Sequence, residues 1–141
     1  MKFWDSSALV ALVIEEASTV AVEYVAARDS EMALWWGARV ECRSAVARRA
    51  RDGGFPVDEA LRASADLELI VAEGSETPPS ETLRKLACEL VDRHPLRAAD
   101  ALQLAAAVTA RAGSARPMEF VCLDQRLRQA AEREGFAVLP V

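Results

Sequence analysis

Short apolar runs alternate along the chain with stretches in which apolar residues recur at helical spacing. The short runs have the length of buried strands. Runs of this kind cover Lys2–Trp4, Met32–Trp36 and Glu119–Leu123, each ended by a polar residue or a glycine. Phe136–Leu139 has the same apolar character, but Pro140 blocks its extension, which indicates an edge strand. The pattern therefore predicts four short strands.

Helical patterns fill the intervals between these strands. Ser6 or Ser7 can cap a helix over Ala8–Ile14, and Ser18 or Thr19 a helix that ends at Ala27. Further helices are predicted over Ala38–Arg51, from Pro56 to about Asp66, from Ser80 to His94, from Arg97 to Arg111 and over Gln125–Glu134. Residues 67–71 fit either a strand or a helix end, and Glu73–Pro79 has the composition of a loop. Strands alternating with helices predict an α/β fold with a largely parallel sheet, and residues 1–141 suit a single domain.

Composition narrows the classes of protein that the chain can belong to. Hydrophobic residues make up 52% of the 141 residues, enough for a packed core. The net charge of −5 disfavours a non-specific grip on nucleic acid, although bound cations can supply positive charge locally. The three cysteines each lie in an apolar run without a C-x-x-C pair, which predicts buried thiols in a reducing compartment. With no apolar run of membrane-spanning length and no leader pattern, a soluble, cytoplasmic protein is expected.

Four acidic residues occupy positions where sites form in α/β proteins. Asp5 and Asp124 directly follow predicted strands, and the carboxyl ends of parallel strands are where such folds bind ligands. Glu41 and Asp100 lie near predicted helix starts among small or apolar neighbours. A carboxylate within an apolar helix such as that around Asp100 is costly unless something pairs with it.

Each acid also has an ordinary structural explanation. Asp5 and Asp124 can cap the helices that follow them, and Glu41 is a good helix former. Asp100 can form an ion pair with a nearby arginine, Arg97 or Arg93. Only the joint placement of the four acids favours a functional site.

The segments around these acids resemble a known family of nucleases. They are Phe3-Trp-Asp-Ser-Ser-Ala-Leu, Ala38-Arg-Val-Glu-Cys-Arg-Ser-Ala, Leu96-Arg-Ala-Ala-Asp-Ala-Leu-Gln-Leu-Ala and Phe120-Val-Cys-Leu-Asp-Gln-Arg-Leu. Together they are similar to the four acidic motifs of PIN-domain nucleases, and most similar to VapC-like toxins of type II toxin–antitoxin systems. The resemblance covers nearly the whole chain. It implies a PIN-like α/β/α sandwich with a central sheet of four or five short strands.

The resemblance also implies an activity and a site. The activity would be a metal-dependent endoribonuclease with Asp5, Glu41, Asp100 and Asp124 as its catalytic acids. Mg²⁺, or Mn²⁺ with the same oxygen ligands, would be held by Asp5, Asp100 and Asp124. Of these acids, Asp5 and Asp100 would be the most direct ligands, and the others could act through water or orient the nucleophile. Ser7 matches the hydroxyl residue that helps to order the site, and a VapB-like antitoxin, an RNA substrate and a homodimer are the implied partners.

Several alternatives stay open. Arg97 could contact a substrate phosphate or hold Asp100 as an ion pair. The chain could also be a PIN-fold binding module without activity, or a phosphatase with Asp5 as nucleophile, although Ser7 stands where such enzymes usually have a second Asp. A nucleotide-binding protein is disfavoured because no phosphate-cradling Gly-rich loop occurs. The single histidine, His94, precedes Pro95 at a predicted helix end, where a cationic side chain suits the helix dipole, so no catalytic or metal-binding role is expected of it.

Overall fold

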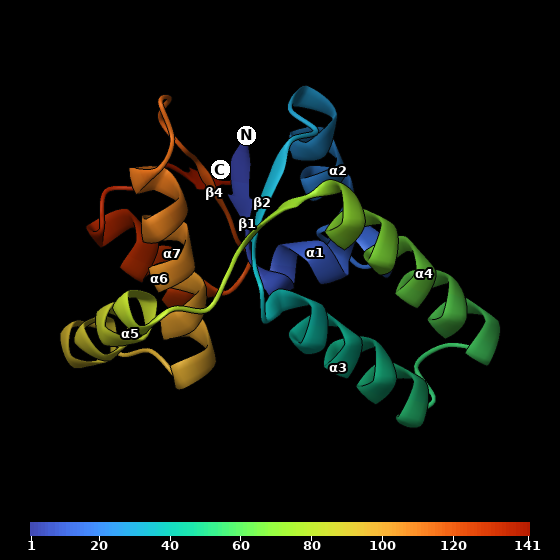
Figure 1. The fold of residues 1–141 in the computed structure, drawn as a ribbon. Coiled ribbons are helices and arrows are strands. Elements are labelled where there is room, and N and C mark those ends of the chain that lie inside the picture. Colours follow the sequence, from blue (N-terminus) through green and yellow to red (C-terminus); the bar gives the residue numbers. More distant parts are fainter.

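The computed structural model describes all 141 residues and shows a five-stranded parallel sheet between two groups of helices (Figure 1). The strands are β1 (Lys2–Trp4), β2 (Met32–Trp35), β3 (Ser75–Thr77), β4 (Phe120–Val121) and β5 (Val138–Leu139). The helices are α1 (Ser6–Val13), α2 (Thr19–Arg28), α3 (Ala38–Arg51), α4 (Val57–Glu73), α5 (Glu81–Arg93), α6 (Ala98–Ala112) and α7 (Gln125–Arg133). The predicted α/β sandwich is confirmed.

Strand order decides which chain segments meet at the carboxyl ends of the strands. The order is β3-β2-β1-β4-β5, with every neighbouring pair parallel. The helices α1 to α4 lie on one side of the sheet and α5 to α7 on the other (Figure 1). The central strand β1 therefore ends between β2 and β4, so the segments after these three strands are neighbours in space although they are far apart in sequence.

The sheet and α6 form the centre of the core. Phe3 and Phe120 are register partners on β1 and β4, and their rings stack with centroids 5.5 Å apart. The face of α6 that packs on the sheet is built largely from alanines with Leu104, all fully buried. Small side chains let the helix approach the sheet closely, and Gln103 of α6 reaches Ser6, just beyond the end of β1.

Two predictions between residues 67 and 79 need correction or completion. The ambiguous stretch 67–71 belongs to α4, which continues to Glu73. The predicted loop 73–79 contains the strand β3, because pairing with β2 makes a strand of the polar run Ser75–Thr77. Only Thr77 of this edge strand is buried, so no apolar pattern signals it. The structure therefore has five strands, four of which lie within the predicted runs.

Local details of two other predictions also differ. The N-cap of α1 is Asp5, while Ser6 and Ser7 lie within the helix. Cys42 and Cys122 are buried as predicted, but Cys88 is exposed because it lies on the outer face of α5. None of the helices is both long and apolar enough to cross a membrane.

Candidate active site

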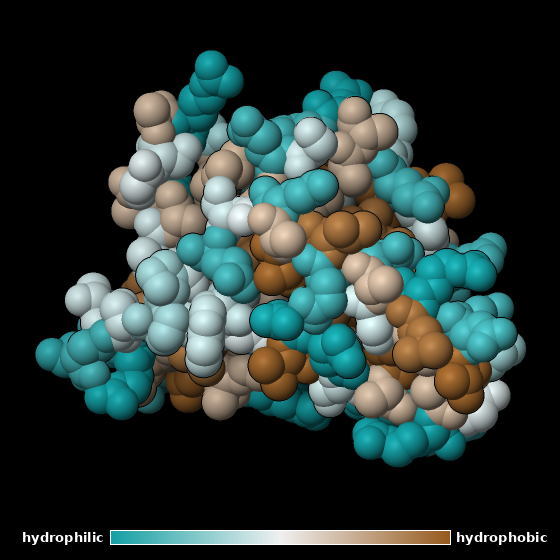
Figure 2. Space-filling model, turned by 45° about the vertical axis from the view of Figure 1, so that its right-hand side comes forward, coloured by the Kyte–Doolittle hydropathy of each residue, from teal (hydrophilic) through white to brown (hydrophobic).

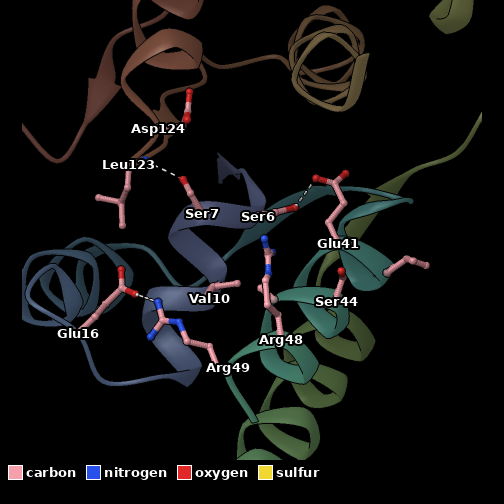
Figure 3. Close-up of a pocket in the computed structure, with 12 residues that line it drawn as sticks. Ser6, Ser7, Val10, Glu16, Glu41, Ser44, Arg48, Arg49, Leu123 and Asp124 are labelled. Atoms are coloured by element: carbon pink, nitrogen blue, oxygen red, sulfur yellow. Dashed lines mark hydrogen bonds and ion pairs between the residues drawn. The ribbon is translucent and has the colours of Figure 1, made fainter. Parts of the chain in front are cut away.

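A cleft of about 660 Å³ opens where the start of α1, the outer face of α3 and the β4–α7 loop meet (Figure 3). Two of the four predicted acids, Glu41 and Asp124, line it from opposite sides. The other two, Asp5 and Asp100, lie beside it. The full lining consists of Ser6, Ser7, Val10, Glu16, Val40, Glu41, Ser44, Ala45, Arg48, Arg49, Leu123 and Asp124.

Asp5 is held at the end of β1 by the helix that it caps. Its carboxylate accepts hydrogen bonds from the Ser7 hydroxyl at 2.7 Å, from the Ser7 amide at 3.2 Å and from the Ala8 amide at 3.3 Å. The side chain is almost completely buried, and this burial raises its pKa to about 6 although the hydrogen bonds oppose the rise. No cationic side chain forms an ion pair with it. Asp5 is thus a fixed carboxylate whose negative charge is poorly compensated.

Ser7 connects Asp5 to the loop that carries Asp124. The Ser7 hydroxyl donates to Asp5 and accepts a hydrogen bond of 2.9 Å from the amide of Leu123, the residue before Asp124 (Figure 3). Asp124 is exposed to the cleft and caps α7 by accepting from the Leu127 amide at 2.9 Å. One hydroxyl therefore holds together the ends of β1 and β4. The structural explanation of both acids as helix caps is correct. Both oxygens of Asp5 accept hydrogen bonds, whereas only one oxygen of Asp124 does, so the other Asp124 oxygen is free for a further contact.

Glu41 is held from two directions by polar side chains. The Ser6 hydroxyl donates to its carboxylate at 3.1 Å, and the Gln103 amide of α6 donates to Ser6 at 2.6 Å and to Glu41 at 3.4 Å. Gln103 is only 1% exposed, and its carbonyl oxygen has no hydrogen-bond partner. Burial raises the pKa of Glu41, and the nearby charge of Asp100 adds to the rise against the effect of these hydrogen bonds.

Asp100 lies in the first turn of α6 and is half-buried. Burial and the charge of Asp124 raise its pKa, and the nearby Arg97 and Arg126 partly offset this rise. Arg97 precedes α6 and forms no ion pair with Asp100, so its charge acts at longer range than predicted for a structural pair. Asp100 thus interacts electrostatically with Glu41 on one side and with Asp124 on the other.

The fold therefore brings the four predicted acids together at the carboxyl ends of β1 and β4. Three of them have raised pKa values, mainly because they are buried; a neighbouring carboxylate adds to the rise at Glu41 and Asp100 but not at Asp5. Hard oxygen donors of this kind fit Mg²⁺ or Mn²⁺. The carboxylates are turned toward caps and hydroxyls, and no three of them form a complete ligand set as they stand. Metal binding by Asp5, Asp100 and Asp124 therefore remains a prediction.

The buried cysteines close to the site do not add soft ligands. Burial raises the pKa of Cys42 to about 12, and it raises the pKa of Cys122 far above the ordinary range, with the charge of Asp5 adding to both. Both therefore stay neutral thiols, which bind metals poorly. The site is an oxygen-donor site.

Two residues that hold the site together were missed at the level of sequence. Ser6 was considered only as a helix cap, and Gln103 was assigned no role. The one available signal was a glutamine among the buried alanines and leucines of a helix, since a buried amide must find partners. Which partners it finds depends on how α6 lies across α1 and α3.

Comparison with known proteins places this site in a known fold. No protein-family model matches the chain, and no curated protein matches it by sequence. Among solved structures, it resembles VapC20 from Mycobacterium tuberculosis, a sarcin-ricin loop cleaving toxin, with a TM-score of 0.71 over 97% of each chain at 17% identity. It also resembles PAE2754 from Pyrobaculum aerophilum (TM-score 0.63, 22% identity, 98% of this chain and 88% of that one) and FitAcB from Neisseria gonorrhoeae (0.65, 17%, 99% and 97%). The chain has the PIN fold of VapC-like proteins.

Proposed function

We propose that this protein is a metal-dependent endoribonuclease and the toxin component of a type II toxin–antitoxin pair. The observation that carries the proposal is the gathering of Asp5, Glu41, Asp100 and Asp124 at one sheet edge of a PIN fold, beside an open cleft. Raised pKa values at three of these acids support a site whose charge is balanced by a cation. The similarity in fold to a toxin that cleaves the sarcin-ricin loop supports RNA as the substrate.

Asp5, Asp100 and Asp124 would hold the cation, with Glu41 nearby. When bound, Mg²⁺ or Mn²⁺ would polarise a phosphate oxygen and lower the pKa of the attacking water. The chain's own contribution is positional. Ser7 keeps Asp5 and the Asp124 loop in register, and the hydrogen bonds of Ser6 and Gln103 aim Glu41 across the cleft.

The geometry argues against the phosphatase alternative. A nucleophilic carboxylate must reach the phosphorus atom, but Asp5 is only 4% exposed and accepts hydrogen bonds from the Ser7 hydroxyl and two amides. Asp5 also does not line the cleft. A role in holding a cation from below the cleft is compatible with this burial.

The test is an RNA-cleavage assay with Mg²⁺, with Mn²⁺ and with a chelator. Cleavage is expected with either metal and is expected to stop in chelator and in the Asp100→Asn variant. Asp92→Asn is the matched control, because Asp92 is an exposed aspartate at the far end of α5 without a polar contact. Full cleavage by Asp100→Asn, or equal cleavage in chelator, would refute the proposal.

The proposed antitoxin partner needs an exposed apolar surface on which to dock. Trp36, between β2 and α3, is 55% exposed, and Val40 on the first turn of α3 is 70% exposed and lines the cleft. Figure 2 shows apolar side chains among polar ones on the face that includes α3 and α4. Exposed aromatic residues of this kind are frequent anchors of protein interfaces.

A substitution at Trp36 tests this part of the proposal. Trp36→Asp is expected to weaken binding of the proposed antitoxin partner by more than tenfold, measured by calorimetry. The control is Val91→Asp, a 44% exposed position on α5 on the other side of the sheet. Equal affinity of Trp36→Asp and wild type would exclude this surface. We also propose a homodimer, which sedimentation of the chain at several concentrations tests.

A further inference from the structure

The arginines of α3 differ in whether a carboxylate holds them. Arg39 and Arg43 contact Glu68 at 2.8 and 3.3 Å, and Arg49 contacts Glu16 at 2.9 Å. Arg48 has no carboxylate partner although it lines the cleft. Figure 3 shows its side chain extended along α3 toward Ser6. Of the two arginines that line the cleft, Arg48 is therefore the one without a carboxylate partner.

The position of Arg48 relative to Glu41 suggests what it binds. Glu41, Ser44 and Arg48 follow one another at helical spacing on the cleft-facing side of α3. Seven residues of helix separate the two charges by about 10 Å along the axis, and the Arg48 side chain points back over part of that distance. An anion on Arg48 would therefore lie in the same cleft as the acidic site, displaced along the groove.

We propose that Arg48 binds a phosphate of the RNA strand that flanks the cleaved bond, and that Glu16 restrains Arg49 from forming a second such contact. This inference rests on the proposed ribonuclease function. A guanidinium is the side chain best suited to a phosphate, because its donors form a planar fork. In Figure 3, Arg49 turns away from Arg48 toward Glu16 at the edge of the cleft.

The negative net charge of the protein makes this contact measurable. With a net charge of −5, little of the RNA affinity can come from a general basic surface. Each phosphate contact to a single strand contributes about 0.7 to the slope of log affinity against log salt concentration. Loss of one contact should therefore change the slope by about that amount.

The experiment measures binding of fluorescein-labelled oligouridine by anisotropy across a KCl series. It uses the Asp100→Asn background with Mg²⁺ so that the RNA stays intact. Arg48→Gln is expected to weaken binding about tenfold and to reduce the salt slope by about 0.7. The matched control is Arg51→Gln, because Arg51 lies on the same helix, is exposed and does not line the cleft. It is expected to leave both values unchanged.

A second variant tests the role of Glu16. Glu16→Gln should tighten RNA binding by releasing Arg49, and the added Arg49→Gln change should remove this gain. In the active protein, which keeps Asp100, the Arg48→Gln change should raise KM by more than it lowers kcat. Unchanged affinity, salt slope and KM in Arg48→Gln, while wild type still cleaves RNA, would overturn this inference alone. Absence of cleavage by wild type with either metal would instead overturn the proposed function, and this inference with it.

Discussion

Replacing Asp5 with Asn should make the protein more stable and inactive. The Asp5 carboxylate is almost completely buried, has no cationic partner and has a pKa raised from the ordinary value of 3.8 to about 6. Above pH 6 the folded protein therefore contains a charge that would be more favourable in water. Asn has nearly the same shape and is an equally good N-cap, but it carries no charge.

The size of the effect follows from the change in pKa. A difference of about two pH units between the folded and unfolded states corresponds to about 3 kcal/mol at pH 7, since one unit is 1.36 kcal/mol. An Asn at this position keeps only some of the three hydrogen bonds from Ser7 and Ala8, which costs about 1 kcal/mol. The expected gain is about 2 kcal/mol. For 141 residues this raises Tm by about 7 °C.

Thermal unfolding followed by circular dichroism in chelator measures this difference. Because the folded pKa of Asp5 lies above its unfolded value, the destabilisation is complete above about pH 6 and disappears as the pH falls toward 3.8. Wild type and Asp5→Asn should therefore converge near pH 4. Added Mg²⁺ should stabilise wild type and not the variant, because the variant lacks one of the three proposed metal ligands.

The comparison with Asp29 provides a control of opposite sign. The N-terminal amine and Lys2 hold Asp29, and hydrogen bonding to the amine lowers its pKa to about 2. Asp29→Asn should therefore destabilise the protein at pH 7, with the difference disappearing as the pH falls from about 4 toward 2. If Asp5→Asn were less stable than wild type at pH 7 in chelator, or the gain did not depend on pH, the reasoning about the buried charge would be wrong.

Three further substitutions test other parts of the structure. Gln103→Leu should lower RNA cleavage about tenfold with less than 1 kcal/mol change in stability. It should also move the acid limb of the pH–rate profile to higher pH, because the Gln103 hydrogen bond lowers the pKa of Glu41 and its loss raises that pKa. An unmoved profile would contradict this role. Arg128→Met should lower Tm by about 10 °C, because its guanidinium donates to the carbonyls of Cys122, Leu139 and Pro140. The expected loss in the free energy of unfolding is ~3 kcal/mol. A Tm within 2 °C of wild type would contradict this role of Arg128. Gly74→Ala should lower the free energy of unfolding by about 1–2 kcal/mol, measured as a lower urea midpoint. The added Cβ would lie 2.9 Å from the Leu34 side chain and 3.0 Å from the Ile70 carbonyl oxygen. An unchanged midpoint would mean that the Leu34 side chain moves aside without strain.

Much of the fold could be predicted because its signals are local. The helix α3 has the predicted bounds, Ala38–Arg51, and α5 begins where a helix was predicted to begin, with Ser80 as its N-cap. The strand β3 could not be predicted, because its polar residues become a strand only by pairing with β2. Likewise, Cys88 lies in an apolar run but on a helix face that nothing covers.

For the candidate site, the sequence by itself determined which acids follow β1 and β4, since a strand and the residue that ends it are neighbours in the chain. Only the tertiary structure decided that Glu41 and Asp100 lie beside them, because this depends on strand order and on how α3 and α6 cross the sheet edge. The same holds for the contacts of Gln103 with Ser6 and for the absence of an ion pair at Arg48. These features depend on distances between segments that are remote in sequence, and no local pattern records such distances.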